Sequence, residues 1–167
     1  MPNQSKKERN AALRNLNMIQ GSKIKKVVTH SDSRGYFREI LRDDDKLLQH
    51  FGQASVSLTN PGVIKAFHWH NHQDDVFYVV RGKAQVVLYD IRRNSNTYKQ
   101  LYTIMMSENN QKLLFIPRKV AHGYKALGKN PLLMLYIMNN PYNKNKPDEE
   151  RIPHDDKQIG FNWARYK

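Results

Sequence analysis

The segment 62–82, GVIKAFHWHNHQDDVFYVVRG, decides the fold because it sets polar, chemically active side chains between two apolar runs. The runs on either side of the polar turn NHQDD are rich in β-branched and aromatic residues, which is typical of strands. Alternate residues of a strand face the same side, so we expect His68 and His70 to point together into the space that the sheet encloses. Asp75 begins the next run. Two imidazoles on one inner face predict a functional site.

Short extended runs of the same kind recur from residue 23 onward, separated by turn-forming clusters such as DSRG, NPG and GKNP. The predicted strands cover residues 23–30, 36–41, 54–59, 63–69, 76–82, 84–91, 98–105, 112–116 and 131–138. So many half-buried strands need a second sheet to cover their apolar faces, which predicts an all-β sandwich or barrel. One short helix is predicted over 44–51, with Asp43 as its N-cap and Gly52 as its stop.

Length and composition predict one globular domain, since 167 residues with 39% hydrophobic content can bury a core without covalent staples. The sequence has no cysteine, which excludes disulfides, thiolate metal sites and cysteine nucleophiles. The apolar runs are far shorter than a membrane span, and the first residues lack the apolar stretch of a signal peptide. We therefore expect a cytoplasmic protein with no membrane partner.

The charge is strongly basic, with a formal net value of +13. Such a charge raises nucleic acid as a partner, but residues 1–26 carry seven of the 28 basic residues and no nucleic-acid motif follows them. We expect part of the charge to serve a phosphorylated small molecule instead. Residues 1–22 are predicted to be a flexible basic arm and 23–167 a single domain. The polar C-terminal stretch ends in Phe161 and Trp163, which predicts that it packs back on the barrel or on a second subunit.

The spacing in segment 62–82 resembles the first cupin motif, with Asp75 where that superfamily usually carries glutamate. A looser resemblance to the second cupin motif lies in IPRKVAHGYKA, where Pro117 and His122 fall at the matching positions. Together the two resemblances imply a cupin jelly-roll barrel, a double-stranded β-helix. Either histidine segment taken alone is also compatible with surface or core histidines.

A closer resemblance, over most of residues 31–163, is to the dTDP-4-dehydrorhamnose 3,5-epimerase family, a cupin branch. The matching segments are DSRGYFRE (32–39), GVIKAFH (62–68), YDIRRNSNTY (89–98), IPRKVAHGY (116–124), LYIMNNPY (135–142) and HDDKQIGFNW (154–163). The resemblance implies an enzyme that works without a metal cofactor on nucleotide-linked 4-keto-6-deoxy sugars during polysaccharide or glycosylated-metabolite biosynthesis. It also implies a homodimer.

The resemblance implies a role for individual residues. His68 matches the family's base, which removes a proton from the carbon beside the ketone, and Tyr136 matches the acid that returns one from the opposite face. These residue types suit the roles because an imidazole titrates near neutrality and a phenol keeps its proton at pH 7. The positions that match substrate-binding residues are Arg34, Glu39, Gln53, Lys65, His122 and Tyr142.

The chain also departs from the family. The family supports its base with an aspartate from a further C-terminal segment that has no counterpart up to Lys167, and His70 and Asp75 replace its usual glutamine and lysine. Two alternatives therefore stay open: a metal-dependent cupin enzyme, and a non-catalytic relative that binds sugar nucleotides. The first would take a divalent transition metal on His68, His70, Asp75 and His122. A carboxylate of Asp74 or Asp75 bonded to His68 or His70 would instead restore the missing support.

Overall fold

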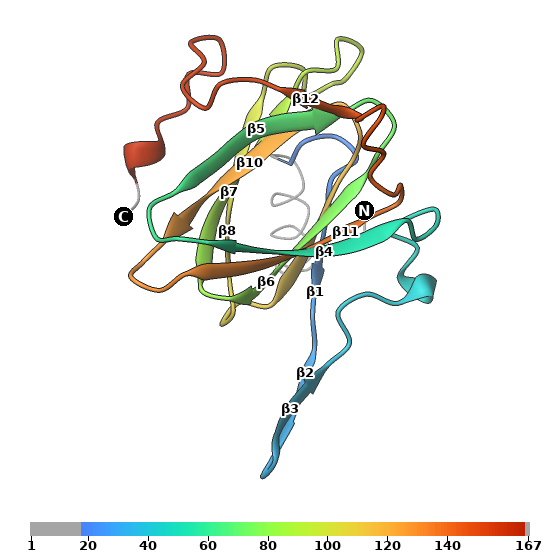
Figure 1. Cartoon of the computed structure of the whole chain (residues 1–167), viewed down its shortest axis with the longest axis vertical. Helices are drawn as coiled ribbons and strands as arrows, with labels where there is room; N and C mark the ends of the chain where they lie inside the picture. Colours follow the sequence, from blue (N-terminus) through green and yellow to red (C-terminus); the bar gives the residue numbers. More distant parts are fainter. Residues whose placement is uncertain (1–17, 166–167) are drawn as a thin grey trace, which may run out of the picture.

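Two five-stranded antiparallel sheets face each other in the computed structural model, which describes residues 18–165 (Figure 1). The strand orders are β1-β9-β6-β11-β4 and β12-β5-β10-β7-β8, and β2 pairs with β3 in a separate hairpin. The strands are β1 (Lys23–Lys26), β2 (Thr29–Asp32), β3 (Gly35–Arg38), β4 (Gln53–Thr59), β5 (Ile64–His70), β6 (Asp75–Arg81), β7 (Lys83–Asp90), β8 (Leu101–Ser107), β9 (Lys112–Ile116), β10 (Val120–Leu127), β11 (Leu132–Met138) and β12 (Glu149–Arg151). The predicted all-β jelly roll is confirmed.

The main core lies between the two sheets, where alternate side chains of facing strands meet. Phe77 and Met134 from one sheet pack with Val86, Leu88 and related residues of the other, and all are inaccessible to solvent. Burial of one such side chain contributes roughly 1.5–3 kcal/mol, so this cluster is the main source of stability. Phe77, Tyr124 and Tyr136 of this cluster also line the cavity described below.

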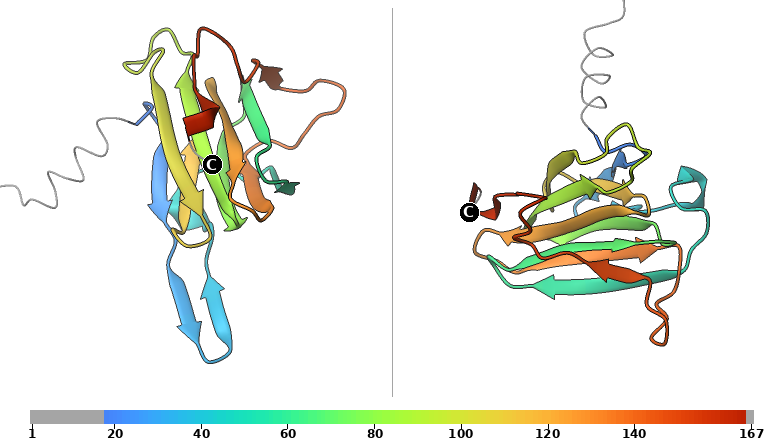
Figure 2. Two further views of the ribbon diagram at one scale, coloured as in Figure 1. Left: turned by 90° about the vertical axis from the view of Figure 1, so that its left-hand side faces the viewer. Right: turned by 90° about the horizontal axis from the view of Figure 1, so that it is seen from above.

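The outer faces are covered by segments of the chain far apart in sequence. Residues 40–48 cover part of the sheet that contains β6, and the C-terminal tail covers the sheet that contains β5 (Figure 2). Trp163 packs against Phe67 with 5.5 Å between ring centroids and a tilt of 45° between the rings, and its indole nitrogen donates to the carbonyl of His154 at 2.9 Å. The prediction that the aromatic tail returns to the barrel is confirmed.

The helix predicted over 44–51 is wrong. A single 3-10 turn spans Asp43–Asp45, and Lys46 ends it in the left-handed conformation with φ of 49°. The acidic side chains turn back on neighbouring groups, since the Asp45 carboxylate accepts from the Arg42 backbone and from Lys25. The consecutive residues Leu47 and Leu48 both pack against the outer cluster, so apolar contacts hold this stretch as a loop.

Strands β10 and β12 were not among the predicted strands. Every residue of β10 except Lys125 is buried, so the strand has no polar alternation by which a half-buried strand is recognised. Strand β12 has three exposed residues and gains its conformation from pairing with β5. Burial on both faces of β10 and the pairing of β12 with β5 both depend on the tertiary structure, so the local sequence does not reveal either strand.

The hairpin β2–β3 extends away from the barrel (Figures 1 and 2). The side chains of Tyr36 and Phe37 on this hairpin are 63% and 65% exposed. Such exposure of two adjacent aromatics is unusual for a surface that meets only water.

The expected arm at 1–22 lies for the most part outside the described residues. Within the described part, Ile19 is buried in the main core, and the Gln20 backbone donates to the Thr97 hydroxyl at 2.9 Å. Across residues 18–165, no helix has the length and apolar character that crossing a membrane requires.

Candidate active site

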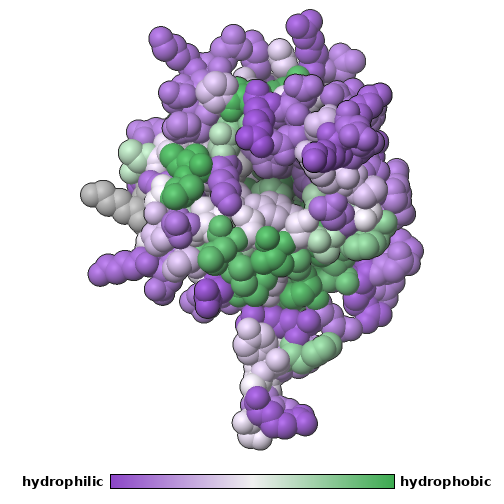
Figure 3. Space-filling view, in the orientation of Figure 1, coloured by the Kyte–Doolittle hydropathy of each residue, from purple (hydrophilic) through white to green (hydrophobic). Residues whose placement is uncertain are grey.

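A cavity of about 950 Å³ lies between the two sheets and is visible as a hollow in Figure 3. Residues of β4, β5, β6 and β11 form its walls, and the segment 140–154 borders it. Its size is that of a small-molecule site, and both polar and apolar side chains line it.

The pairing of β5 with β10 determines which side chains enter the cavity. His122 is the direct cross-strand partner of His68, and the register then shifts by one residue so that Tyr124 pairs with Lys65. This extra residue on β5 lets Lys65 and His68 both face the cavity although they are three positions apart. Gly123 permits the close approach, because a Cβ there would lie 2.2 Å from the Cβ of Ala66.

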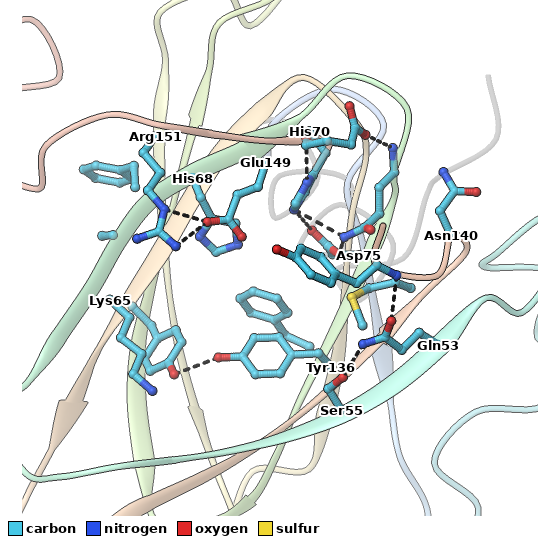
Figure 4. A pocket seen from close by; sticks show the side chains of 18 of the residues that line it. Gln53, Ser55, Lys65, His68, His70, Asp75, Tyr136, Asn140, Glu149 and Arg151 are labelled. Atoms are coloured by element: carbon cyan, nitrogen blue, oxygen red, sulfur yellow. Dashed lines mark hydrogen bonds and ion pairs between the residues drawn. The ribbon is translucent and has the colours of Figure 1, made fainter. Parts of the chain in front are cut away.

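Three imidazoles and one carboxylate meet at the cavity wall, and Figure 4 labels three of these four residues, His68, His70 and Asp75. His68 and His70 come from β5, Asp75 from β6 and His122 from β10, and one ligand atom from each lies within 4.8 Å of all the others. The Asp75 Oδ2 atom is 3.1 Å from Nε2 of His122 and 3.4 Å from Nε2 of His70. The prediction that His68 and His70 share an inner face with Asp75 beside them agrees with this arrangement.

Burial and neighbouring groups shift the pKa values of His68 and Asp75. Burial, followed by the charge of His122, holds the pKa of His68 well below its ordinary value, so the ring is neutral near pH 7. Burial alone would raise the pKa of Asp75, but the contacts with His122 and the other imidazoles outweigh it and lower that pKa. A neutral imidazole with an ionised carboxylate nearby is able to accept a proton.

Tyr136 enters the cavity from the opposite sheet, on β11, so it faces His68 across the cavity (Figure 4). Its hydroxyl donates to the Tyr124 hydroxyl at 2.7 Å, and Tyr124 in turn contacts the Thr59 hydroxyl at 2.9 Å. Burial, and then the proximity of Tyr124, raise the pKa of Tyr136. The phenol is therefore neutral and holds a proton throughout the physiological range.

Other predicted site residues are divided between the cavity and the surface. Gln53, Lys65 and Tyr142 line the cavity, and Gln53 accepts a hydrogen bond from the Tyr142 backbone at 2.7 Å. His122 lies behind the wall, 1% exposed. Arg34 and Glu39 do not line the cavity in this chain, because they belong to the hairpin region.

Arg34 instead pairs with Asp32, and Glu39 pairs with Arg42, both at the surface. Asp74 is also directed away from the imidazoles. Its carboxylate accepts from the Arg118 backbone and guanidinium at 2.8 and 2.9 Å. The carboxylate beside the imidazoles is thus that of Asp75.

Several polar residues of the cavity were missed from the sequence, among them Gln73, Glu149 and Arg151. Gln73 donates to Asp75 Oδ1 at 2.8 Å, and Arg151 forms an ion pair with Glu149 at 2.6 Å. Strand β12 places Arg151 opposite His68 and Glu149 opposite His70. The signal for Gln73 was present in the turn NHQDD, whereas β12 had no local signal.

Comparison with known proteins gives consistent matches. The profile of the dTDP-4-dehydrorhamnose 3,5-epimerase family matches residues 17–167. The spore coat polysaccharide biosynthesis protein SpsL of Bacillus subtilis is 55% identical over 87% of this chain and 97% of its own length. A probable low-salt glycan biosynthesis epimerase, Agl13, of Haloferax volcanii is 36% identical over 87% of this chain and 94% of its own length.

Solved structures match over the whole barrel. A dTDP sugar isomerase from Desulfovibrio desulfuricans superposes with a TM-score of 0.83 and 29% identity, covering 89% of this chain and 94% of that one. An epimerase from Legionella pneumophila, solved with dTDP-4-keto-L-rhamnose, has a TM-score of 0.78 and 26% identity, covering 87% and 79%. The resemblance drawn from six sequence segments is confirmed: the chain belongs to the dTDP-4-dehydrorhamnose 3,5-epimerase family of sugar isomerases.

Proposed function

We propose that this chain epimerises a nucleotide-linked 4-keto-6-deoxy sugar at a carbon next to the ketone, with His68 as the base and Tyr136 as the acid. The observation that carries the proposal is the position of these two side chains on opposed sheets, facing one cavity. A sugar ring between them would present one face to the imidazole and the other to the phenol. Inversion of a carbon centre requires this two-sided arrangement.

Two proton transfers, one on each face of the sugar ring, invert the carbon. Neutral His68 takes the proton from the carbon beside the ketone, which leaves an enolate and an imidazolium. Tyr136 then gives its proton to the opposite face of that carbon, which restores the ketone and leaves a phenolate. Exchange with solvent returns both groups to their starting states. The Tyr136 hydroxyl, which donates to Tyr124 in the free protein, must turn toward the sugar first.

Cationic and polar side chains on the wall are proposed to bind the substrate. Lys65 donates to the Ser57 hydroxyl at 2.7 Å and supplies a positive charge at the cavity, suited to an anionic oxygen. Gln53 holds the segment that carries Tyr142, whose exposed ring can stack on a nucleotide base. His122, behind the wall, would orient His68 instead of touching the sugar.

A homodimer is part of the same proposal. Val56 and Leu58 on the outer face of β4 are 62% and 57% exposed. Figure 3 shows an apolar surface on the side of the molecule where β4 lies. A second copy would cover them and bring its own projecting hairpin to this cavity, which is how Arg34 and Glu39 would reach a substrate. Light scattering should give twice 19.7 kDa. We also propose a cytoplasmic location, where the activated sugar is available before polymer assembly.

Solvent deuterium exchange tests the catalytic roles. With a dTDP-4-keto-6-deoxy sugar in D₂O, His68→Ala should lose both deuterium uptake and inversion, by roughly 10²–10⁴-fold. Tyr136→Phe should keep uptake on the His68 side but lose inversion, because the base still exchanges its proton with solvent. Mass spectrometry measures uptake, and NMR measures the configuration of the product.

His72→Ala is the matched control, since its side chain is exposed on the same turn. The His72→Ala variant should retain both deuterium uptake and inversion. Undiminished uptake in a folded His68→Ala variant would overturn the proposal. Sugar-nucleotide binding without uptake by the unmodified protein would favour the non-catalytic alternative.

A further inference from the structure

The cluster of His68, His70, Asp75 and His122 has more nitrogen ligands than a single proton transfer uses. Its members come from three strands, and Asp75 on β6 belongs to the sheet opposite the histidines. All four side chains are buried or half-buried. The question is which partner the inward-facing nitrogen atoms have.

Hydrogen bonds to carbonyls fix the tautomers of two rings. Nδ1 of His70 lies 3.0 Å from the carbonyl oxygen of Asp148, and Nδ1 of His122 lies 2.9 Å from that of Val120. A carbonyl oxygen accepts hydrogen bonds and cannot donate, so Nδ1 carries the hydrogen in both rings. In the neutral rings, both Nε2 atoms therefore present lone pairs, and both face Asp75.

Of these two nitrogen atoms, Nε2 of His122 lacks a favourable contact, because a lone pair that faces a carboxylate has no donor. Nε2 of His122 is fully buried and has no hydrogen-bond partner, although Asp75 Oδ2 is 3.1 Å away. Leaving such a group unsatisfied is costly. One proton could join Asp75 to one of the two nitrogens, whereas a cation can accept lone pairs from all of them at once.

The geometry suits a metal ion after a small contraction. Ligand atoms around a four-coordinate ion with bonds near 2.0–2.1 Å are about 3.3 Å apart, and the four atoms here lie within 4.8 Å of one another. Gln73 would act as an outer partner, because its amide holds Asp75 Oδ1 at 2.8 Å. The same amide lies 3.3 Å from His70 Nε2 and would have to release that atom.

We propose that His68, His70, Asp75 and His122 form a binding site for a divalent transition metal, and that the metal competes with the proton transfer assigned to His68. Three imidazoles and a carboxylate are a donor set that suits Zn²⁺, Co²⁺ or Fe²⁺. The competing part of the proposal rests on the proposed function, since a lone pair given to a metal cannot accept a proton. The site itself does not depend on that function.

Cobalt binding tests the site directly. The full chain, treated with a chelator and then titrated with Co²⁺, should develop visible ligand-field absorption that saturates at one equivalent, and Zn²⁺ should remove it. His70→Gln and Asp75→Asn should each weaken binding by at least about tenfold. His72→Gln, which changes an exposed histidine two residues from His70, should bind as the unmodified chain does. Circular dichroism confirms that each variant is folded.

No saturable absorption in the unmodified chain, or an unchanged spectrum in folded His70→Gln, would overturn the metal site. The deuterium exchange assay with and without one equivalent of Zn²⁺ then tests the competition. We expect uptake to fall at least tenfold with Zn²⁺ and to return with chelator. If the protein saturated with Zn²⁺ takes up deuterium as fast as the metal-free protein, the competition is overturned. If the metal-free protein takes up no deuterium, the proposed function is contradicted, but the cobalt titration still tests the metal site.

Discussion

Two buried aspartates in this barrel have opposite surroundings. Asp90, at the end of β7, accepts five hydrogen bonds, from the backbone and guanidinium of Arg92 and from the hydroxyls of Ser95 and Thr97. Asp75, at the start of β6, accepts one from Gln73 among the bonds of the described residues, and otherwise faces imidazole nitrogens.

The difference separates a structural carboxylate from a functional one. Burial by itself would raise the pKa of Asp90, but the bonds from Arg92, Ser95 and Thr97 lower it to about 2, from an ordinary value of 3.8. The charge of Asp90 is matched by donors before any ligand arrives, so it holds the loop 91–97 in place. The Asp75 carboxylate has fewer hydrogen-bond donors around it than it can accept from, so this buried site can still bind a proton, a substrate or a metal.

The largest expected effect is on stability, for Asp90→Asn. The asparagine side chain lacks the negative charge that pairs with Arg92, and its NH₂ group would face other hydrogen-bond donors. We therefore expect the free energy of unfolding to fall by about 2–4 kcal/mol. Urea unfolding followed by circular dichroism measures the change. Asp43→Asn is the control, because the Asp43 side chain is 97% exposed, and its effect should stay within about 0.5 kcal/mol. A loss below about 1 kcal/mol for Asp90→Asn would mean that the donors reorganise.

Most of the strands were predictable because alternation and turn residues are local signals. Segments such as 63–69 and 84–91 coincide closely with β5 and β7. Strand β10 was missed because burial on both faces removes the alternation. The predicted helix failed because the acidic residues at 43–45 bond to Lys25, Arg42 and Lys46, which a local helix pattern does not reveal.

Part of the site was also predictable from local alternation along a strand. The pair His68 and His70 follows from strand periodicity, and His122 and Tyr136 entered through the family resemblance. The two cupin motif spacings brought Asp75 and His122 together only in the metal-binding alternative, and their approach to 3.1 Å depends on how β6 and β10 meet across the barrel. Arg151 reaches the cavity because β12 pairs with β5, a contact between residues about 80 positions apart.

The second effect, smaller than the first, is on catalysis, for Asp75→Asn. The amide can keep its oxygen toward Gln73 and donate from its nitrogen to the lone pair of His122, so stability should change by less than about 1 kcal/mol despite burial. Deuterium uptake in chelator-treated buffer should fall about three- to tenfold, because the carboxylate charge that raises the basicity of His68 is lost.

Asp74→Asn is the matched control for uptake, since the neighbouring carboxylate pairs with Arg118 outside the cluster. It should keep the uptake rate of the unmodified chain. If Asp75→Asn lowers the free energy of unfolding as much as Asp90→Asn does, both aspartates are structural and the distinction between them is wrong.

The smallest effect is a pH dependence that belongs to Asp90. Its pKa is lowered in the folded chain, so the stability it contributes is complete above the unfolded value of 3.8 and is lost as the pH falls toward about 2. A protonated carboxyl resembles the amide of Asp90→Asn, in that both lack the charge for Arg92. The difference in unfolding free energy between the two proteins should therefore be constant from pH 6 to pH 5 and shrink between pH 4 and pH 3. Urea titrations at each pH measure it, and a difference that stays constant down to pH 3 would assign the stabilisation to packing instead of charge.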